Sequence, residues 1–443
     1  MISLQQIAAI AFIYHFLYYL SSRGWYLTTT NFLPVFGFSV SQKIKLFIIS
    51  STIIACISSI YFNNQLTSLF LFLSIVFYVL TISFRLSNHV LLIFTLTIGA
   101  IFENQCELDN TIGFGQLFSF FILLIMYIVS FVHKLNRSFL SDKESSALLM
   151  SDRFVYRFES HRIRKLIPIF ILITYLFIPM LLFYGPTFPV GVMLALSIHF
   201  LYGLSGNPHF SFLVVLLYSK FLDLNHIDFY IFVLSMILSV ASIVQFTIRR
   251  NEWVFAYKAL GLFLIFLLNT IIFYIAFLTM NQLPDSPSIL IDLTVSQIGV
   301  LAATIIFLII NGISPYIFAK SEFCLAMFSN LRIDHNNHLF LKNSKVAKCY
   351  AADYCRITRI SNLHYARSSK IRVIRHLSYL LDRHETHMYS GYFIRQAENF
   401  LTAYGYSDIS IHVDSETPLQ KNSSNVIFKP YMIPIDKTVG VMG

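Results

Sequence analysis

Ionisable side chains that can move protons gather in one stretch of an otherwise apolar chain. His199 lies inside an apolar run, and the polar residues that follow it are Asn207, His209, Lys220, Asp223, His226 and Asp228. An imidazole accepts a proton near neutral pH, and a lysine amine in apolar surroundings gives up its own proton more readily than in water. The pattern predicts a polar pocket between helices, with Lys220, His199 and His209 as its acid–base residues.

The same residues also have a purely structural interpretation. Asp223 follows Lys220 by three residues, so on a continuous helix the two side chains can neutralise each other. Lys220, Asp223, His226 and Asp228 would then lie at a helix end among lipid headgroups. In the same interpretation, His199 joins two helices by a hydrogen bond. No set of Cys, His and carboxylate ligands completes a metal site, so we predict no bound metal.

Membrane-spanning helices must position these residues. Of the 443 residues, 56% are hydrophobic and only 12% are charged, about half the charged share of a soluble domain. Uncharged runs approach the ~20 residues that cross a bilayer as a helix. We predict an α-helical polytopic membrane protein with nine to eleven transmembrane helices. The eleven candidate runs are 7–20, 46–62, 66–84, 90–102, 114–132, 166–184, 190–204, 210–221, 227–248, 254–280 and 289–318.

Loop charges predict an orientation. The segment 134–165 carries eight basic residues, and Arg249, Arg250 and Lys258 form a second basic loop, whereas the loops at 103–109 and around Asp285 carry only acidic charge. Because cytoplasmic loops are enriched in Lys and Arg, eleven crossings would place the N-terminus outside and the basic C-terminal tail inside. The net charge of +10 therefore favours contact with anionic lipid, and we predict no nucleic-acid partner.

The composition changes near residue 321, which predicts a membrane domain over 1–320 and a small soluble domain over 321–443. Apolar residues recur at helical spacing over 371–381 and again over 393–401, where Gly405 is placed to end the second helix. Residues 409–413 alternate as a strand, for which 426–428 is a candidate partner. The tail is therefore predicted to be a basic α+β domain.

The most specific string lies where the membrane domain meets the tail. It reads Met-Phe-Ser-Asn-Leu-Arg over 327–332 and continues with Asn-His-Leu-Phe over 337–340. It resembles the signature that follows the last span in the HTTM (horizontally transferred transmembrane domain) family, the bacterial relatives of vitamin K-dependent gamma-carboxylase. The residues that carry this resemblance are Ser329, Asn330, Arg332, Asn337 and His338. The run from His199 to Phe212 is similar to the family's His-containing span and the Phe-Ser-rich span after it.

The resemblance implies a multi-pass protein of the bacterial inner membrane that acts on a quinone, a lipid or a membrane-associated peptide, with a reduced quinone as cofactor. The carboxylases use a lysine within the membrane to deprotonate that quinone. No lysine here lies in a motif that matches theirs, so the carboxylation reaction itself is not carried over. Ser329, Asn330, Arg332, Asn337 and His338 would organise the junction.

A second hypothesis assigns the protein no catalysis. In it the protein is a membrane maturation or immunity factor for a secreted peptide, and the tail after Arg332 is the docking module. A transporter would show paired broken helices with inverted symmetry, which the sequence does not show.

Overall fold

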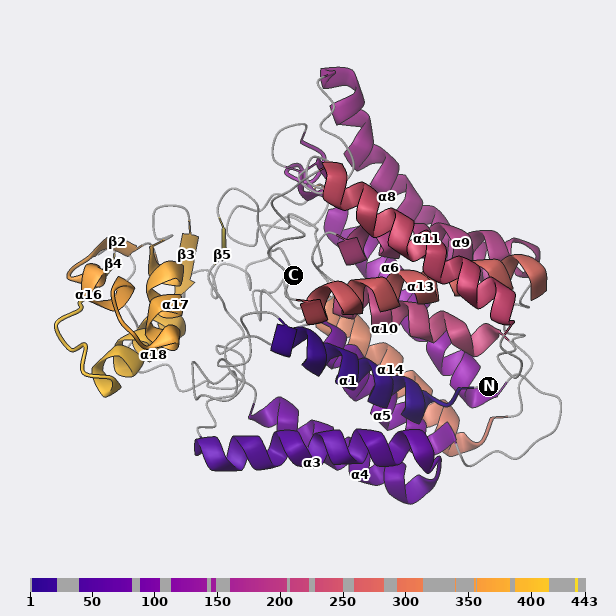
Figure 1. Ribbon diagram of the computed structural model, residues 1–443, viewed down its shortest axis with the longest axis horizontal. Helices are drawn as coiled ribbons and strands as arrows, with labels where there is room; N and C mark the ends of the chain where they lie inside the picture. The colour runs from indigo at the N-terminus through magenta and orange to yellow at the C-terminus, as the bar shows by residue number, and fades with distance from the viewer. Residues whose placement is uncertain are drawn as a thin grey trace.

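The protein is a bundle of apolar helices followed by a small mixed domain (Figure 1). The computed structural model describes residues 2–21, 40–81, 88–103, 113–141, 145–148, 160–204, 208–222, 228–249, 259–282, 293–313, 339, 354–355, 357–382, 387–413 and 435–436. Eleven α-helices form the body within these ranges. They are α1 (Leu4–Ser21), α3 (Gln42–Tyr61), α4 (Gln65–Leu80), α5 (Asn88–Glu103), α6 (Phe114–Lys134), α8 (His161–Phe183), α9 (Phe188–Leu204), α10 (Pro208–Tyr218), α11 (Phe229–Arg249), α13 (Ala259–Gln282) and α14 (Val295–Ile313), with single 3-10 turns η1 (Gly185–Thr187) and η2 (Ser219–Phe221).

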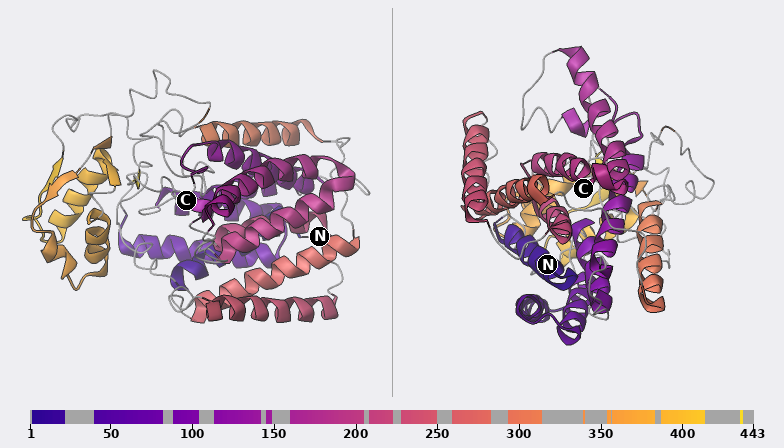
Figure 2. Two further views of the ribbon diagram at one scale, coloured as in Figure 1. Left: turned by 90° about the horizontal axis from the view of Figure 1, so that it is seen from above. Right: turned by 90° about the vertical axis from the view of Figure 1, so that its right-hand side faces the viewer.

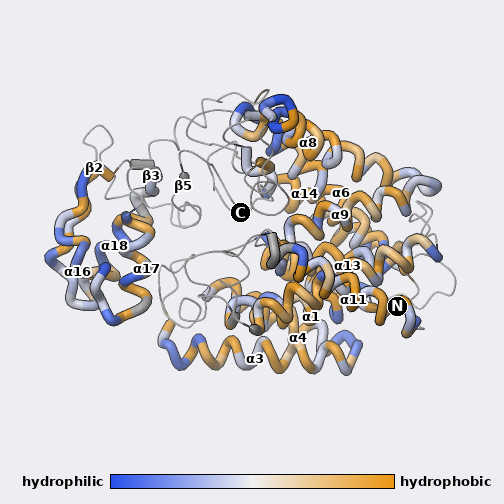
Figure 3. The backbone as a smooth tube through the Cα atoms, turned by 45° about the horizontal axis from the view of Figure 1, so that its top comes forward, coloured by the Kyte–Doolittle hydropathy of each residue, from blue (hydrophilic) through white to orange (hydrophobic). Residues whose placement is uncertain are grey.

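The prediction of a helical polytopic membrane protein is confirmed. Each of the eleven predicted runs overlaps one of the eleven helices. Six of the described helices are long and apolar enough to cross a membrane, namely α3, α6, α8, α9 with η1, α13 and α14, while α1, α4, α5 and α11 are shorter apolar helices. Large apolar side chains are exposed on the outside of the bundle, for example Phe47 on α3, Phe170 on α8 and Ile310 on α14. Figure 3 shows that the helices of the bundle are mostly hydrophobic along their length. Such a surface is suited to lipid and not to water.

Polar side chains begin several of these helices. The Ser41 hydroxyl accepts a hydrogen bond from the Ile44 amide at the start of α3, and Asn64 with Thr67 forms a capping box on α4. The Asp228 carboxylate accepts from the Ile231 amide at 3.0 Å and caps α11 in the same way. Asp228, which the sequence grouped with the polar pocket, is thus an exposed helix cap.

Hydrogen bonds between helix ends show which ends lie together. The Leu4 amide of α1 donates to Glu103 at the end of α5, and Gln5 donates to the Phe62 carbonyl just after α3. Gln297 near the start of α14 donates to the Phe102 carbonyl of α5. We call this the Glu103 end of the bundle. Because α3 runs toward it, the Lys43 end of α3 lies at the opposite end.

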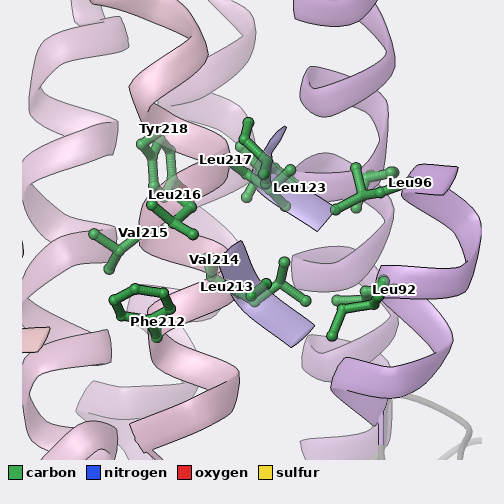
Figure 4. Packing of buried hydrophobic residues seen from close by; sticks show 14 of the residues in the cluster. Leu92, Leu96, Leu123, Phe212, Leu213, Val214, Val215, Leu216, Leu217 and Tyr218 are labelled. Atoms are coloured by element: carbon green, nitrogen blue, oxygen red, sulfur yellow. The ribbon is translucent and has the colours of Figure 1, made fainter. Parts of the chain in front are cut away.

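Helix α10 is the central element. All of its residues except His209 are buried, and it packs against α1, α5, α6, α9 and α13. Leu213, Val214 and Leu217 are fully enclosed, and Figure 4 shows this part of α10 beside side chains of neighbouring helices. A helix that is apolar on every side is stable only when other helices surround it. Its 11 residues rise about 16 Å, roughly half of the ~30 Å hydrocarbon core.

The tail has its own hydrophobic core and forms a separate group of elements (Figures 1 and 2). Its elements are β1 (Tyr354–Cys355), β2 (Ile357–Ile360), α16 (Leu363–Arg367), α17 (Arg372–Leu381), β3 (His387–Ser390), α18 (Gly391–Ala403), β4 (Ile411–Val413) and β5 (Ile435–Asp436). Strands β1, β3 and β5 form one antiparallel sheet, and β2 pairs with β4 in another.

The two predicted tail helices are confirmed as α17 and α18, and Gly405 has the positive φ of 82° that suits a residue just past a helix end. The predicted strand is β4, but its partner is β2, with Ile360 opposite Ile411. The segment 426–428, which we expected as the partner, lies outside the described residues. The division between 1–320 and 321–443 stays a prediction, because residues 314–338 also lie outside them.

Candidate functional site

The three predicted acid–base residues lie in three different sets of contacts. His209 is near the beginning of α10 and Lys220 is in η2 after its end, a separation of roughly 16 Å along the helix axis. His199 lies on α9. The single pocket that the sequence predicted around them is therefore replaced by three separate polar groups, each assembled with residues from other helices.

Lys220 belongs to an ion pair at the Glu103 end. Its Nζ lies 2.6 Å from Glu103 Oε1 and also donates to the Ile2 carbonyl at 2.8 Å. The other carboxylate oxygen of Glu103 accepts from the Leu4 amide at 2.6 Å. Both side chains are nearly enclosed, with exposed fractions of 5% and 14%. Gln116 of α6 donates to the Lys220 carbonyl at 2.9 Å.

These contacts suit a protonated ammonium group that joins helix ends. Among the described residues the carboxylate beside Lys220 is that of Glu103, and the pairing of Lys220 with Asp223 stays a prediction. Residues Asn207, Asp223 and His226 lie outside the described residues. A base role for Lys220 stays a prediction, and it would require this pair to open.

Three histidines from distant parts of the chain meet beside α10. We call His15 of α1, His89 of α5 and His209 of α10 the histidine cluster. His89 Nε2 lies 2.5 Å from His15 Nδ1, and the ring centroids of His89 and His209 are 4.0 Å apart. His15 and His89 are each 1% exposed, whereas His209 is partly accessible.

Tyrosines extend the histidine cluster on two sides. The second ring nitrogen of His15 lies 3.3 Å from the Tyr78 hydroxyl of α4. The Tyr18 ring packs on His209 with centroids 4.7 Å apart, and the Tyr19 ring packs on His15 at 4.6 Å. Tyr78, His15 and His89 thus form a buried hydrogen-bonded row, and His209 stands beside it at the accessible end.

This arrangement can accept, share and release a proton. A neutral imidazole has one donor and one acceptor nitrogen, so linked imidazoles pass a proton by exchanging these roles. His15 uses both of its nitrogens within the row. Among the described residues no group of three His, Cys, Asp or Glu side chains is arranged to hold a metal ion.

His199 lies in a second buried polar group, between α6, α8, α9 and α10. Its Nε2 lies 2.9 Å from the Tyr127 hydroxyl, which in turn accepts from the Tyr218 hydroxyl at 3.1 Å. Tyr175 and Tyr202 form a second hydrogen-bonded pair beside Tyr127. We call Tyr127, Tyr175, Tyr202 and Tyr218 the tyrosine cluster.

A buried lysine lies against the tyrosine cluster. Lys134, the last residue of α6, places its Nζ 4.1 Å from the centre of the Tyr175 ring and 5.9 Å from that of Phe139. A cation over an aromatic face is attracted by the electron-rich ring. Lys134 therefore places a basic amine against these phenols, a role that the sequence alone did not indicate because Lys134 was predicted to belong to a basic loop.

His15, His89 and the four tyrosines are functional candidates that only the structure reveals. His15 and His89 are single histidines within or at the start of apolar runs, and an ionisable residue in a span is itself a signal. Buried tyrosines carry no comparable signal, because 25 of them are spread over the chain and nothing in their spacing shows which ones meet.

The residues of the junction signature all lie outside the described residues. They are Ser329, Asn330, Arg332, Asn337 and His338. The next residue, Leu339, is described, and its amide donates to the Leu135 carbonyl at 2.9 Å, directly after Lys134. The chain just past the signature therefore meets the end of α6, opposite the Glu103 end.

The described residues establish an integral membrane protein with several apolar helices. The three polar groups within these residues are the Lys220–Glu103 pair, the histidine cluster and the tyrosine cluster with His199. No protein-family profile, curated protein or solved structure matches the chain.

Proposed function

We propose that the protein is a multi-pass membrane enzyme of the HTTM type that performs acid–base chemistry on a substrate delivered from the bilayer. The observation that carries this proposal is the meeting of His15, His89 and His209, from three helices, inside an apolar bundle. Placing imidazoles in a membrane interior is costly, so such residues are generally retained for a function.

The three histidines divide naturally into two roles. His209 is the partly accessible member, so it is the group that meets the substrate and takes or gives a proton there. His89 and His15 are enclosed and lead to the Tyr78 hydroxyl, so they carry the proton away from the reacting atoms. His199 on α9 and Lys220 after α10 support this site from a distance. Residues 329–338 organise the junction between the membrane domain and the tail.

The resemblance to the HTTM family and the residues around His209 indicate the substrate class. A quinone, a lipid or a membrane-associated peptide can reach a site within the bundle through the bilayer. The residues fit a reduced quinone, because the imidazole of His209 can accept a hydroxyl proton and the Tyr18 ring beside it offers a flat aromatic face. A bound reduced quinone would supply ionisable hydroxyl groups and electrons.

The test compares ligands retained by purified protein. Full-length wild type, His209→Gln and His89→Gln would be purified from their native membrane, and the organic extract analysed for quinones and lipids by mass spectrometry. His161→Gln is the matched control, because His161 is exposed at the start of α8. We expect a specific hydrophobic compound that falls at least about tenfold in both cluster variants and stays unchanged in the control.

Equal amounts of every extracted compound in wild type and folded variants would overturn the proposal. Thermal unfolding of each variant separates loss of ligand from loss of fold. Stoichiometric transition metal in the wild type, lost in His89→Gln, would also overturn it, because the cluster would then be a metal site.

A second candidate function rests on the tail. The tail has a hydrophobic core of its own, built from residues such as Ile374, Leu377 and Ile394. This favours the hypothesis of a maturation or immunity factor that docks a secreted peptide through its tail. Removal of the segment after Arg332 should then abolish function while the isolated tail still captures the peptide, and a tail that captures none would exclude it.

A further inference from the structure

The contacts of His199 define which of its nitrogens carries the proton. The Tyr218 hydroxyl donates to the Tyr127 oxygen, so the single proton of Tyr127 is directed to its other neighbour, Nε2 of His199. A neutral imidazole that accepts at Nε2 carries its proton on Nδ1. His199 Nδ1 is therefore a donor.

This donor is buried and has no hydrogen-bond partner among the described residues. His199 is 1% exposed, so lipid and bulk water do not reach the ring. An unsatisfied buried donor is rare in native proteins, and an ordered water is a frequent explanation.

A second unsatisfied group lies along the same seam between α9 and α10. The Ser211 hydroxyl of α10 is also buried without a hydrogen-bond partner in the described ranges. Gly203 follows His199 by one helical turn, so both lie on the same face of α9. A Cβ built on Gly203 would lie 2.4 Å from the Leu268 side chain of α13 and 3.8 Å from the Ser211 Cβ, so Ser211 borders this face of α9 together with Leu268.

We infer that one water molecule is bound between His199 Nδ1 and the Ser211 hydroxyl, and that Tyr218, Tyr127, His199 and this water form a continuous hydrogen-bonded chain. The water accepts from Nδ1–H and hydrogen-bonds the hydroxyl, so both unsatisfied groups gain a partner. Two polar partners are the minimum for an ordered internal water.

The donors and acceptors of this chain run in one direction. Tyr218 donates to Tyr127, Tyr127 donates to His199 Nε2, and His199 Nδ1–H donates to the water. This order holds the neutral His199 ring in the tautomer with its proton on Nδ1.

This inference does not depend on the function proposed for the histidine cluster. A structural hydrogen bond between α6 and α9 would need only Tyr127 and His199. It would not require Tyr218 to donate, Ser211 to lack a partner, or a water molecule beside Nδ1.

Magic-angle-spinning NMR of the full-length protein in liposomes tests the chain directly. The protein would be labelled with 15N only at its histidines, and the His199 signals assigned by their loss in His199→Gln. We expect the tautomer with its proton on Nδ1 and strong magnetisation transfer from water to that proton. Ser211→Ala should lower this transfer at least about threefold, because the water loses a partner.

Two tyrosine variants complete the test. Tyr127→Phe should introduce the tautomer with its proton on Nε2, because the donor to that nitrogen is gone. Tyr202→Phe is the matched control, since it removes an equally buried hydroxyl outside the chain and should leave the His199 signals unchanged.

A wild-type ring protonated on Nε2 would overturn the inference, and so would a proton on Nδ1 that receives no magnetisation from water. Neither result bears on retention of a ligand by the histidine cluster, so the two proposals fail separately.

Discussion

Lys220 and Glu103 lie 117 positions apart in the sequence, yet their Nζ and Oε1 atoms are 2.6 Å apart in a nearly closed space. The pair joins η2 to the end of α5, and its remaining hydrogen bonds hold Ile2 and Leu4 at the start of α1. A charge in such a position is tolerated because the opposite charge and the backbone groups replace water.

Breaking this pair from one side should destabilise the bundle. Glu103→Gln leaves the Lys220 ammonium buried without a counter-charge, and we expect a loss of ~3–5 kcal/mol in the free energy of unfolding. Thermal unfolding of the purified protein in detergent measures the change. The double variant Glu103→Gln with Lys220→Met should lose less than Glu103→Gln alone, and a double variant that is less stable than either single one would contradict a structural role for the pair.

Gly115 of α6 should not tolerate a side chain, because a Cβ there would lie 1.9 Å from Glu103 Oε1 and 2.9 Å from Lys220 Nζ. We expect Gly115→Ala to displace the carboxylate and to lower stability by ~1–3 kcal/mol, the usual cost of overpacking. Gly299→Ala on α14 is the matched control, since no atom lies within 4 Å of its Cβ position. That change should raise stability slightly, because alanine favours a helix over glycine. Equal effects of the two changes would show that the close approach at Gly115 does not matter.

The orientation in the membrane can be read from the two ends of α3. Ser41 caps its beginning beside Lys43, and Asn63 is exposed just past its end. Because basic ends face the cytoplasm, we expect Asn63→Cys to react with a membrane-impermeant maleimide on intact cells and Ser41→Cys to react only after permeabilisation. Both changes would be made in a protein with its five native cysteines replaced. The reverse labelling pattern would contradict the predicted orientation.

Glu398 of α18 should make the tail less stable as the pH rises. Burial is the main cause that raises the pKa of this carboxyl above 4.5, while a hydrogen bond from the Ile411 amide and the nearby His412 oppose the rise. The folded tail therefore binds a proton more tightly than the unfolded chain. This contribution is complete below the unfolded pKa of about 4.5 and is lost as the pH rises through the higher folded pKa.

Hydrogen exchange of the tail amides between pH 4 and pH 7 measures this effect. Glu398→Gln cannot ionise, so it should flatten the pH dependence of protection, after correction for the intrinsic exchange rate. Asp408→Asn serves as the control, because it removes an exposed carboxyl of the tail. A tail whose protection has the same pH dependence in wild type and Glu398→Gln would contradict the prediction.

The sequence alone determined the membrane class, the positions of the helices and the two tail helices, because these depend on local composition and spacing. An apolar run such as 210–221 must be enclosed by lipid or by other helices, whatever its neighbours are. The amphipathic repeat of 371–381 likewise forms a helix when it covers a core. Both inferences need only residues that are close in the chain.

Only the tertiary structure decided which polar groups meet. Lys220 was expected in one pocket with His199, but helix packing places its amine beside Glu103. His209 was expected with His199 and Lys220, but it lies with His15 and His89, from helices far earlier in the chain. The partner of a side chain in a bundle depends on how each helix is rotated and which helices are neighbours. Those choices are made by the packing of many apolar residues at once, and no local pattern in the sequence records them.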